Sequence, residues 1–382
     1  MTIYLDNAAT SFPKPQSVYR EMEKVMRYCA NPGRSGHRMA LESGRVIHRT
    51  RELIAKLFGI ENTLRIILTH NGTEALNLGI KGYLRPGDHV VTTSMEHNSV
   101  LRPLRSLEDD GIIDVTLIEG DDQGRIKVED VERGIRKNTR LIITTHASNV
   151  TGTLLPIKEI GDLADSYGIT YMVDAAQSAG AYEIPINKWK IDLLAFPGHK
   201  GLLGPQGTGA LYVREGIRLK PLWEGGTGSQ SESLIQPQLL PDRFESGTHN
   251  TIGLGGLGAG IQFILEEGLD TIRRHEEKLT QRLLDGLMGI KGVRVFGPGN
   301  IKEQAGVVSF LIQGLDCSEL SFMLDNNYDI ASRSGLHCAP LAHRTIGTFE
   351  TGTVRLSVGY FNRMREIDRA IEAIEEISRF AR

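Results

Sequence analysis

The stretch Phe196-Pro-Gly-His-Lys-Gly-Leu-Leu-Gly-Pro-Gln-Gly-Thr-Gly-Ala210 places one lysine, Lys200, between a histidine and a glycine-rich run. It follows Ile191-Asp-Leu-Leu-Ala-Phe196, whose short apolar character predicts a buried strand. A lysine just beyond a buried strand, in a loop that lets the backbone approach a ligand, is placed to hold a carbonyl as a Schiff base. An isolated loop lysine is more often a solvated surface residue, so the rest of the chain must decide between these interpretations.

The composition is that of an ordinary globular protein long enough for two domains, with 382 residues, 40% hydrophobic and 24% charged. The net charge of -3 gives no indication of a nucleic acid or an anionic membrane as partner. Three cysteines without a C-x-x-C pair do not form the pattern of a disulfide framework or a zinc ribbon, which favours a reducing compartment. Neither a signal peptide nor an apolar run of about 18 residues is evident, so we expect a cytoplasmic protein.

Between about residues 60 and 215, short apolar runs alternate with helical patterns such as 157–167. The expected strands are 65–69, 89–93, 115–118, 141–145, 171–173, 193–196 and 209–213. This alternation predicts an α/β fold with a mostly parallel sheet that helices cover on both faces.

In the second half of the chain the sequence pattern changes twice, first to a loop-like composition and then to a new set of strand and helix patterns. Residues 216–250 are rich in Gly, Ser, Thr and Pro, which predicts a loop long enough to suggest a function. A long helical stretch follows over about 251–290, with a charged face at 266–267 and 273–278 that we expect to be solvated. Strand and helix patterns after residue 291 predict a smaller α+β unit. We therefore expect a large domain over 14–274 and a small C-terminal domain over 275–382 that includes residues 1–13.

Polar residues follow several of the expected strands. Gly72 and Thr73 stand where a strand gives way to a helix, and a helix N-terminus can hold a phosphate. Asp174 ends an apolar strand, where a buried carboxylate needs a partner such as a ligand cation. His97 and Asn149 follow two further strands. Taken singly, each has an ordinary structural explanation: Gly72 and Thr73 as a capped turn, Asp174 as an N-cap, His97 as a structural histidine and Asn149 as a turn residue.

What these residues share is their place at the C-terminal end of a strand. In a parallel sheet those ends lie on one edge, where ligands bind in open α/β sheets. A phosphate cradle, a neighbour for a flat ring, a partner for a cation and an amine for a carbonyl together specify pyridoxal 5′-phosphate (PLP) as the cofactor.

The combination resembles a known family. Asp174-x-x-Gln177 followed by Gly198-His-Lys200 is similar to the core of the class V aminotransferases, which are fold-type I PLP-dependent transferases. The segments that extend the resemblance over almost the whole chain are Tyr4-Leu-Asp-Asn-Ala-Ala-Thr10, Gly72-Thr-Glu74, Met95-Glu-His97, Ser148-Asn149 and Gly247-Thr248. Arg333-Ser-Gly-Leu-His-Cys-Ala-Pro340 resembles the signature of the cysteine desulfurase and selenocysteine lyase branch.

The resemblance implies a role for each matching residue at the cofactor. Lys200 would bind PLP covalently and move the proton at the substrate Cα, and Asp174 would keep the ring nitrogen protonated. Gln177 would bind the phenolic oxygen of the ring, and His97 would stack on the ring and take part in catalysis. The phosphate would be held by Gly72, Thr73 and His199, with Thr248 reaching it from a second subunit.

The resemblance also implies a substrate site. Asn149, which would contact the cofactor as well, and Arg355 would hold the substrate carboxylate, Arg355 by a bidentate fork. Arg34 and His37 match a segment that lines the site of a neighbouring subunit in a homodimer. Arg333 would help to order the cysteine loop beside the substrate. One position departs from the family: Pro197 stands where relatives commonly have a phosphate-binding serine, and proline lacks that hydroxyl and a backbone N–H.

Cys338 decides the predicted subfamily because it lies in a polar Gly/His/Pro loop, whereas Cys29 and Cys317 have the pattern of inert cysteines. His337 and Arg333 nearby would favour the thiolate, and the spacing to His343 fits no common zinc pattern, so no metal is expected. We therefore predict a cysteine desulfurase that converts L-cysteine to L-alanine and forms a persulfide on Cys338 for a sulfur-acceptor protein. The alternatives are a selenocysteine lyase acting on L-selenocysteine, another class V aminotransferase or C–S lyase, and a catalytically silent PLP-binding or sulfur-relay protein.

Overall fold

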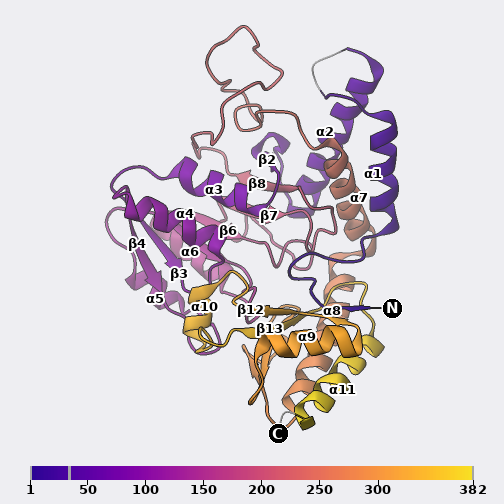
Figure 1. The fold of residues 1–382 in the computed structure, drawn as a ribbon. Coiled ribbons are helices and arrows are strands. Elements are labelled where there is room, and N and C mark those ends of the chain that lie inside the picture. Colours follow the sequence, from indigo (N-terminus) through magenta and orange to yellow (C-terminus); the bar gives the residue numbers. More distant parts are fainter. Residues whose placement is uncertain (1, 33–35, 381–382) are drawn as a thin grey trace.

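The computed structural model describes residues 2–32 and 36–380, and the chain forms two units that lie one above the other in Figure 1. The upper unit is built on a seven-stranded sheet and the lower unit on a four-stranded sheet. The two termini both lie at the lower unit, in which the N-terminal strand and the last helix pack.

The large sheet has the strand order β2-β8-β7-β6-β5-β3-β4. Its strands are β2 (Ile66–Thr69), β3 (Asp88–Thr93), β4 (Ile113–Ile118), β5 (Thr139–Thr145), β6 (Thr170–Asp174), β7 (Leu193–Pro197) and β8 (Gly209–Val213). Only β8 runs antiparallel to its neighbours, so the other six strands share one direction. The prediction of a mostly parallel sheet is confirmed, and the carboxyl ends of the six strands meet at one edge.

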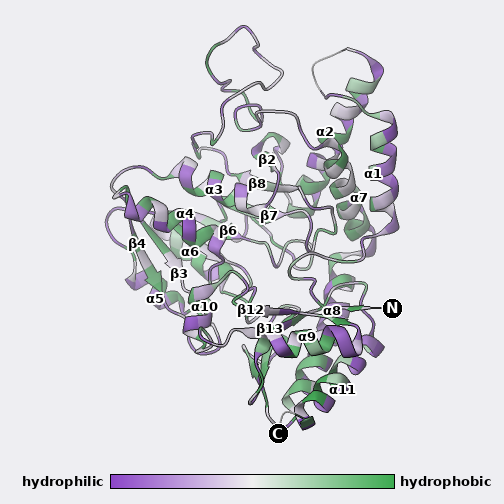
Figure 2. Ribbon diagram, viewed as in Figure 1, coloured by the Kyte–Doolittle hydropathy of each residue, from purple (hydrophilic) through white to green (hydrophobic). Residues whose placement is uncertain are grey.

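The large sheet is apolar on both sides because helices cover both of its faces. Ile66 and Leu68 belong to one core and Ile67 to another, as expected when successive side chains of a strand point to opposite faces. The helices of this unit are α1 (Gln16–Tyr28), α2 (Arg38–Phe58), α3 (Gly72–Tyr83), α4 (Asn98–Asp109), α5 (Val128–Arg133), α6 (Ile157–Ser166) and α7 (Thr251–Glu267), with a 3-10 turn at Thr63–Arg65. Figure 2 shows the hydrophobic colouring concentrated on the strands and on the helix faces that meet them.

The lower unit has an antiparallel sheet of order β12-β13-β10-β9 and its own core. Its elements are α8 (Leu269–Met288), β9 (Val293–Phe296), β10 (Val307–Ile312), α9 (Cys317–Tyr328), β11 (Ile330–Ala331), β12 (Arg333–Gly335), α10 (Pro340–Thr345), β13 (Thr353–Ser357) and α11 (Met364–Phe380). The strand β1 (Ile3–Tyr4) pairs with β11, and Leu5 joins the core of this unit. A domain boundary at residue 275 stays a prediction.

The expected single helix over 251–290 is two helices, because Gly268 takes a left-handed φ of 84° between α7 and α8. The expectation that 273–278 is a solvated face is also wrong in part. Arg273 packs its guanidinium 4.1 Å from the ring centre of Tyr182, and its side chain is only 14% exposed. The region 214–250 has neither helix nor strand, as predicted, and it projects from the top of the molecule in Figure 1.

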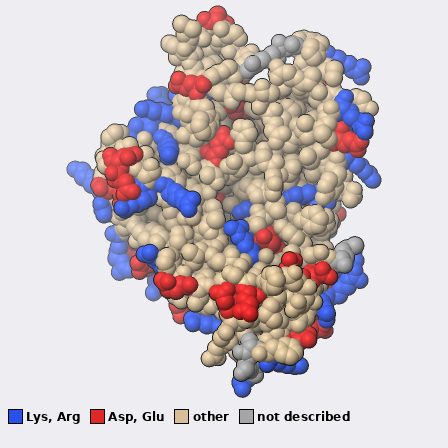
Figure 3. All heavy atoms as spheres, in the orientation of Figure 1, with Lys and Arg blue, Asp and Glu red and all other residues tan. Residues whose placement is uncertain are grey.

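Charged side chains of both signs are spread over the face shown in Figure 3 and do not gather into one field. Within residues 2–32 and 36–380, no helix combines the length and the apolar character that crossing a membrane requires.

Candidate active site

The chain turns toward Lys200 immediately after β7. A Cβ on Gly198 would lie 2.2 Å from Thr208 Oγ1, so only glycine fits at this turn. Lys200 is half-buried, and its burial lowers the pKa of the ammonium group to about 8. The carboxylate of Asp174 opposes that shift, whereas Arg355 adds to it. A lysine with this pKa is partly a free amine near neutral pH, as a base or a Schiff-base lysine must be.

Pro197 ends β7 without breaking the sheet. Gly198 N donates to Thr208 O at 2.8 Å, which makes the Pro197–Gly209 pair a non-hydrogen-bonded pair of the β7–β8 ladder. The proline therefore removes no bond of that ladder. Its ring lies against the start of α3, where a Cβ on Gly72 would be 3.1 Å from Pro197 Cδ. Glycine at position 72 thus accommodates proline at position 197.

Asp174 and Gln177 stand at the same edge of the sheet, after β6. Asp174 is 3% exposed, and one of its carboxylate oxygens accepts from Ala176 N at 2.9 Å. Burial raises the pKa of Asp174, and the bond from Ala176 and the charge of Lys200 oppose this rise. Gln177 Nε2 donates to Ala8 O at 3.1 Å. Gln177 and Lys200 line one small cavity of about 50 Å³ between the two units.

The N-terminus of α3 is capped by Asn71, whose Oδ1 accepts from Glu74 N at 2.8 Å. Thr73 is therefore not the cap, and its hydroxyl is hydrogen-bonded instead to Ser99 Oγ at 2.8 Å. Gly72 and Thr73 contribute the first N–H groups of the helix, which have no partner within it. This arrangement suits a phosphate.

His97 is the N-cap of α4, and its Nδ1 accepts from Ser99 N at 3.0 Å. Burial, with nearby cations led by Lys200, lowers the pKa of His97 to about 4. The imidazole is thus neutral, and because Nδ1 accepts, Nε2 carries the proton. A neutral flat ring at this edge suits stacking on another flat ring.

His199 is fixed through its backbone, because its carbonyl oxygen accepts from Ser11 N at 3.0 Å and from Lys14 Nζ at 2.8 Å. Burial lowers the pKa of its imidazole to about 4. Its Nδ1 is buried and has no hydrogen-bond partner among the described residues. A buried nitrogen without a partner is a candidate contact for a bound ligand.

Arg355 lies on β13 and is 1% exposed, yet not all of its guanidinium N–H groups are hydrogen-bonded within the described residues. Its Nη1 donates to Asn149 O at 3.0 Å, and its Nη2 donates to Asp6 Oδ1 at 2.8 Å. Its Nε is buried without a partner in the described part of the chain, which leaves a donor for a carboxylate. The Asn149 side chain donates to His337 O at 2.7 Å, so in this structure it holds the loop that leads to Cys338.

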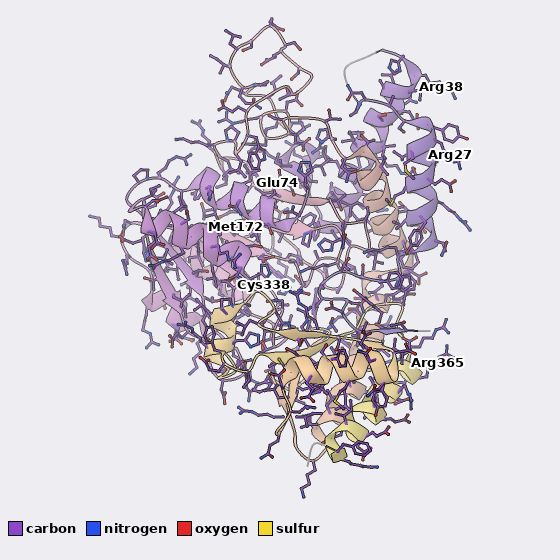
Figure 4. The ribbon with its side chains drawn as sticks, viewed as in Figure 1. Arg27, Arg38, Glu74, Met172, Cys338 and Arg365 are labelled. Carbon is purple, nitrogen blue, oxygen red and sulfur yellow. The ribbon has the colours of Figure 1, made fainter. Side chains whose placement is uncertain are left out.

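Cys338 is the exposed residue of the loop between β12 and α10, at the junction of the two units (Figure 4). His337 and Cys338 have left-handed φ angles of 49° and 59°, which residues other than glycine rarely adopt. Asn98 N donates to Cys338 O at 2.8 Å, so the loop rests on the start of α4. Arg333 Nη2 lies 3.7 Å from Cys338 Sγ. Arg333 therefore contacts the thiol directly.

The expectation that His337 favours the Cys338 thiolate is wrong. His337 is 3% exposed, and its Nε2 pairs with Thr353 Oγ1 at 3.1 Å. Burial, together with Arg355, lowers the pKa of His337 to about 2. The imidazole is neutral at any physiological pH, and of the two predicted cations only Arg333 remains.

The residues expected to serve a neighbouring subunit do not join Lys200 in this chain. Thr248 lines a hollow with His70 and Trp223, whose described lining does not include Lys200. His37 is the N-cap of α2, with Nδ1 accepting from Ala40 N at 3.3 Å. Arg34 lies outside the described residues.

Two acidic residues of the site were missed by sequence reasoning, although both stand in segments that were singled out. Asp6, in Tyr4–Thr10, pairs with Arg355 across 349 positions of sequence. Glu96, in Met95–His97, is completely buried. A surface hollow of about 580 Å³ between α1, α2 and α7 includes none of the predicted site residues in its described lining, whereas a hollow of about 790 Å³ at the start of α3 includes Thr73.

The assembled edge fits PLP in each of its parts. The start of α3 and the free Nδ1 of His199 suit a phosphate, and the neutral His97 suits the face of a ring. The buried Asp174 suits a protonated ring nitrogen, whose positive charge would offset the desolvation of the carboxylate. Lys200 follows on the next strand along the sheet and supplies an amine for the aldehyde.

Comparisons with known proteins agree with this geometry. A sequence model of the family described as aminotransferase class-V matches residues 3–370. A probable cysteine desulfurase of Methanothermobacter thermautotrophicus is 38% identical, over 98% of this chain and 94% of the relative. A cysteine desulfurase of Haloferax volcanii is 30% identical, over 98% and 88%.

Solved structures give the same result for the fold. The apo structure of the cysteine desulfurase from Thermococcus onnurineus superposes with a TM-score of 0.94 at 37% identity, covering 99% of this chain and 95% of the other. A cysteine desulfurase from Escherichia coli, in an S-sulfonic acid form, superposes with a TM-score of 0.90 at 26% identity, with 99% and 95% covered. The chain belongs to the class V aminotransferase family, in its cysteine desulfurase branch.

Proposed function

We propose that this protein is a PLP-dependent cysteine desulfurase that converts L-cysteine to L-alanine and leaves the sulfur as a persulfide on Cys338. The observation that carries the proposal is the position of Cys338. Its thiol is exposed on a left-handed loop and contacts Arg333. The loop is hydrogen-bonded to two residues that follow strands of the same sheet edge as Lys200, through Asn98 N to Cys338 O at 2.8 Å and Asn149 Nδ2 to His337 O at 2.7 Å.

When bound, PLP supplies an aldehyde that bonds reversibly to amines and a ring that withdraws electrons from the substrate α-carbon. Asp174 would hold the ring nitrogen protonated, and Gln177 would bind the phenolic oxygen. His97 would lie against the ring. Gly72, Thr73 and His199 would hold the phosphate, and Asn149 would also face the cofactor once its amide leaves His337 O.

The substrate would be oriented by Arg355, which Asp6 and the carbonyl of Asn149 already hold in place. Its Nε, which has no partner among the described residues, would donate to the substrate carboxylate. Lys200 takes the proton from the substrate Cα, since its lowered pKa of about 8 leaves part of it as free amine.

Cys338 then removes the sulfur. Its thiolate forms an S–S bond to the substrate sulfur as the Cβ–S bond breaks. The electron pair of that bond stays with the carbon skeleton, which takes up a proton at Cβ, regains at Cα the proton that Lys200 removed, and leaves as alanine. Both sulfurs remain on the enzyme as a persulfide, and no external oxidant or reductant is consumed.

We infer further that the protein works as a cytoplasmic homodimer and passes its sulfur to an acceptor protein. A dimer would bring Thr248 of one chain to the phosphate of the other, and the segment of Arg34 and His37 to its substrate site. What supports this is that Thr248 and His37 do not reach Lys200 within one chain. The exposure of Cys338 supports delivery to a macromolecule.

The test is mass spectrometry of the PLP-loaded protein after treatment with L-cysteine. A gain of about 32 Da on the peptide that contains Cys338, equal to one sulfur atom, is expected. Cys338→Ala should keep bound PLP but lose sulfide release, and Cys29→Ala is the matched control that keeps both. Undiminished desulfuration by Cys338→Ala would refute the role. Keto-acid formation would indicate an aminotransferase, and a much faster reaction with L-selenocysteine would indicate a selenocysteine lyase.

A further inference from the structure

The large sheet changes its winding direction between β3 and β5. The chain leaves β3 for β4 at the sheet edge and then returns across β3 to β5, β6 and β7. Such a switch opens a crevice at the carboxyl ends of the two strands, and ligands bind there. The registered pairing of β3 with β5 ends at Val91 and Ile142, so the last residues of both strands lie beyond the ladder.

The side chain of Glu96 fills this opening. Its Oε1 accepts from Thr93 Oγ1 at 2.6 Å and from Thr145 N at 3.0 Å. Thr93 is the last residue of β3 and Thr145 the last of β5, so one carboxyl oxygen ties the two strand ends together. Glu96 is completely buried, and its Oε2 has no partner among the described residues.

Glu96 lies directly behind two predicted contacts of the cofactor ring. The next residue, His97, caps α4. On the other side, Thr145 is in register with Asp174 on β6, and His146 N donates to Asp174 O at 2.9 Å. A displacement of Thr145 would therefore be transmitted to Asp174 through the β5–β6 pairing.

We propose that Glu96 is a positioning residue of the cofactor site, which joins β3 to β5 and so fixes His97 at the face of the ring and Asp174 at the ring nitrogen. This deepens the proposed function and rests on it only in that the site holds PLP. The carboxyl group acts in its neutral form. Burial raises the pKa of Glu96 to about 8, and the charge of Asp174 adds to the rise. Ionisation would leave an unpaired charge, whereas the acid leaves only one hydroxyl without a partner.

The titratable groups that face Glu96 are Asp174 on β6 and Tyr171 on the same strand, and neither is a cation. The pKa of Glu96 is above the ordinary 4.5 in the folded state. Its stabilising effect is thus complete below pH 4.5 and is lost as the pH rises through about 8.

The experiment compares Glu96→Gln and Glu96→Ala with Asp192→Asn. Glutamine keeps an acceptor for Thr93 and Thr145 and cannot ionise, whereas alanine removes the connection. Asp192 is the matched control because it is a buried carboxylate of the same sheet, 4% exposed and bonded to Tyr171 N at 2.8 Å. It precedes β7, so it lies at the edge opposite the site. The two measurements are the Kd for PLP by titration and the melting temperature of the PLP-free protein against pH.

We expect Glu96→Gln to bind PLP within about threefold of the unmodified protein, and Glu96→Ala to bind at least about tenfold more weakly. Asp192→Asn should lower the melting temperature without changing the Kd. The melting temperature of Glu96→Gln should fall less between pH 5 and 8 than that of the unmodified protein.

Three outcomes overturn this inference or its basis. If Glu96→Gln loses PLP as Glu96→Ala does, the charged form is needed and the neutral acid is refuted. If Glu96→Ala retains PLP as Asp192→Asn does, the residue is merely structural. If the unmodified protein does not bind PLP, the proposed function fails as well, which separates that failure from the other two.

Discussion

The two reactive side chains of the proposed site are held in opposite ways. Lys200 follows a strand buried over its whole length, and at its turn Gly198 leaves no room for a side chain. Cys338 is exposed on a loop that is hydrogen-bonded to the large unit through Asn98 N to Cys338 O and Asn149 Nδ2 to His337 O. The lysine lies directly after a buried strand of the sheet, and the cysteine lies on a loop of the other unit.

This difference corresponds to the two tasks. A proton moves between fixed atoms, so its carrier gains from a rigid, desolvated setting that lowers the pKa of the amine. A sulfur must leave the site, so its carrier needs a position that another molecule can reach. The left-handed φ angles of His337 and Cys338 place backbone strain at this position. If the surroundings of Lys200 and the loop of Cys338 work independently, a substitution in one should leave the reactivity of the other unchanged.

The largest expected effect is that of Lys200→Met. Desulfuration should fall by at least about 10³-fold, because both covalent attachment of PLP and proton transfer are lost. The PLP-free variant should at the same time be more stable. The fall of the Lys200 pKa from 10.5 to about 8, caused mainly by burial, corresponds to about 3 kcal/mol of net destabilisation of the charged form in the folded protein.

The sign of this stability change depends on pH. Because the folded protein binds the proton of Lys200 less tightly than the unfolded chain does, the cost is complete below pH 8 and disappears as the pH rises past 10.5. The gain of Lys200→Met in denaturant unfolding should therefore shrink at alkaline pH. Lys158→Met, which changes an exposed lysine paired with Asp162, is the control. An equal gain in both variants would contradict the interpretation.

The sequence predicted the edge that carries Lys200 better than it predicted the surroundings of Cys338. Strand ends are local features, since a short apolar run followed by Asp174 or by Gly198 can be read within a few residues. The neutrality of His337 depends on burial under the loop, which comes from packing between distant segments. The pairing of Asp6 with Arg355 joins the two ends of the chain, and the bridging by Glu96 depends on where β3 and β5 diverge. No local sequence pattern predicts these contacts between distant segments.

An intermediate effect is expected for Arg333→Ala. The guanidinium lies 3.7 Å from Cys338 Sγ, and a contact between partly exposed groups contributes at most about 1 kcal/mol. Alkylation of Cys338 by iodoacetamide at pH 7 should slow by about fivefold, and Arg333→Lys should restore most of the rate. Peptide mass spectrometry separates this thiol from Cys29 and Cys317.

The same alkylation rate tests whether the two regions are independent. It should be unchanged in Lys200→Met, because no described bond connects that side chain to the loop. A slowing as large as that of Arg333→Ala would show that the lysine and the cysteine form one coupled unit.

The smallest expected effect concerns Pro197, where the sequence departs from its family. The proline removes no bond of the β7–β8 ladder, and its ring packs against Gly72 at the predicted phosphate cradle. Pro197→Ser should therefore fold and should bind PLP about threefold more tightly, since its hydroxyl adds one hydrogen bond to the phosphate. Pro197→Ala removes the ring without adding the donor and should show no gain. Pyridoxal, which lacks the phosphate, should bind equally to all three proteins. A gain in affinity shared by Pro197→Ala, or one also seen with pyridoxal, would mean that the proline acts through its packing against Gly72 rather than through a missing donor. The affinity of this edge for PLP would then depend on the packing of the backbone and not on the number of hydrogen bonds to the phosphate.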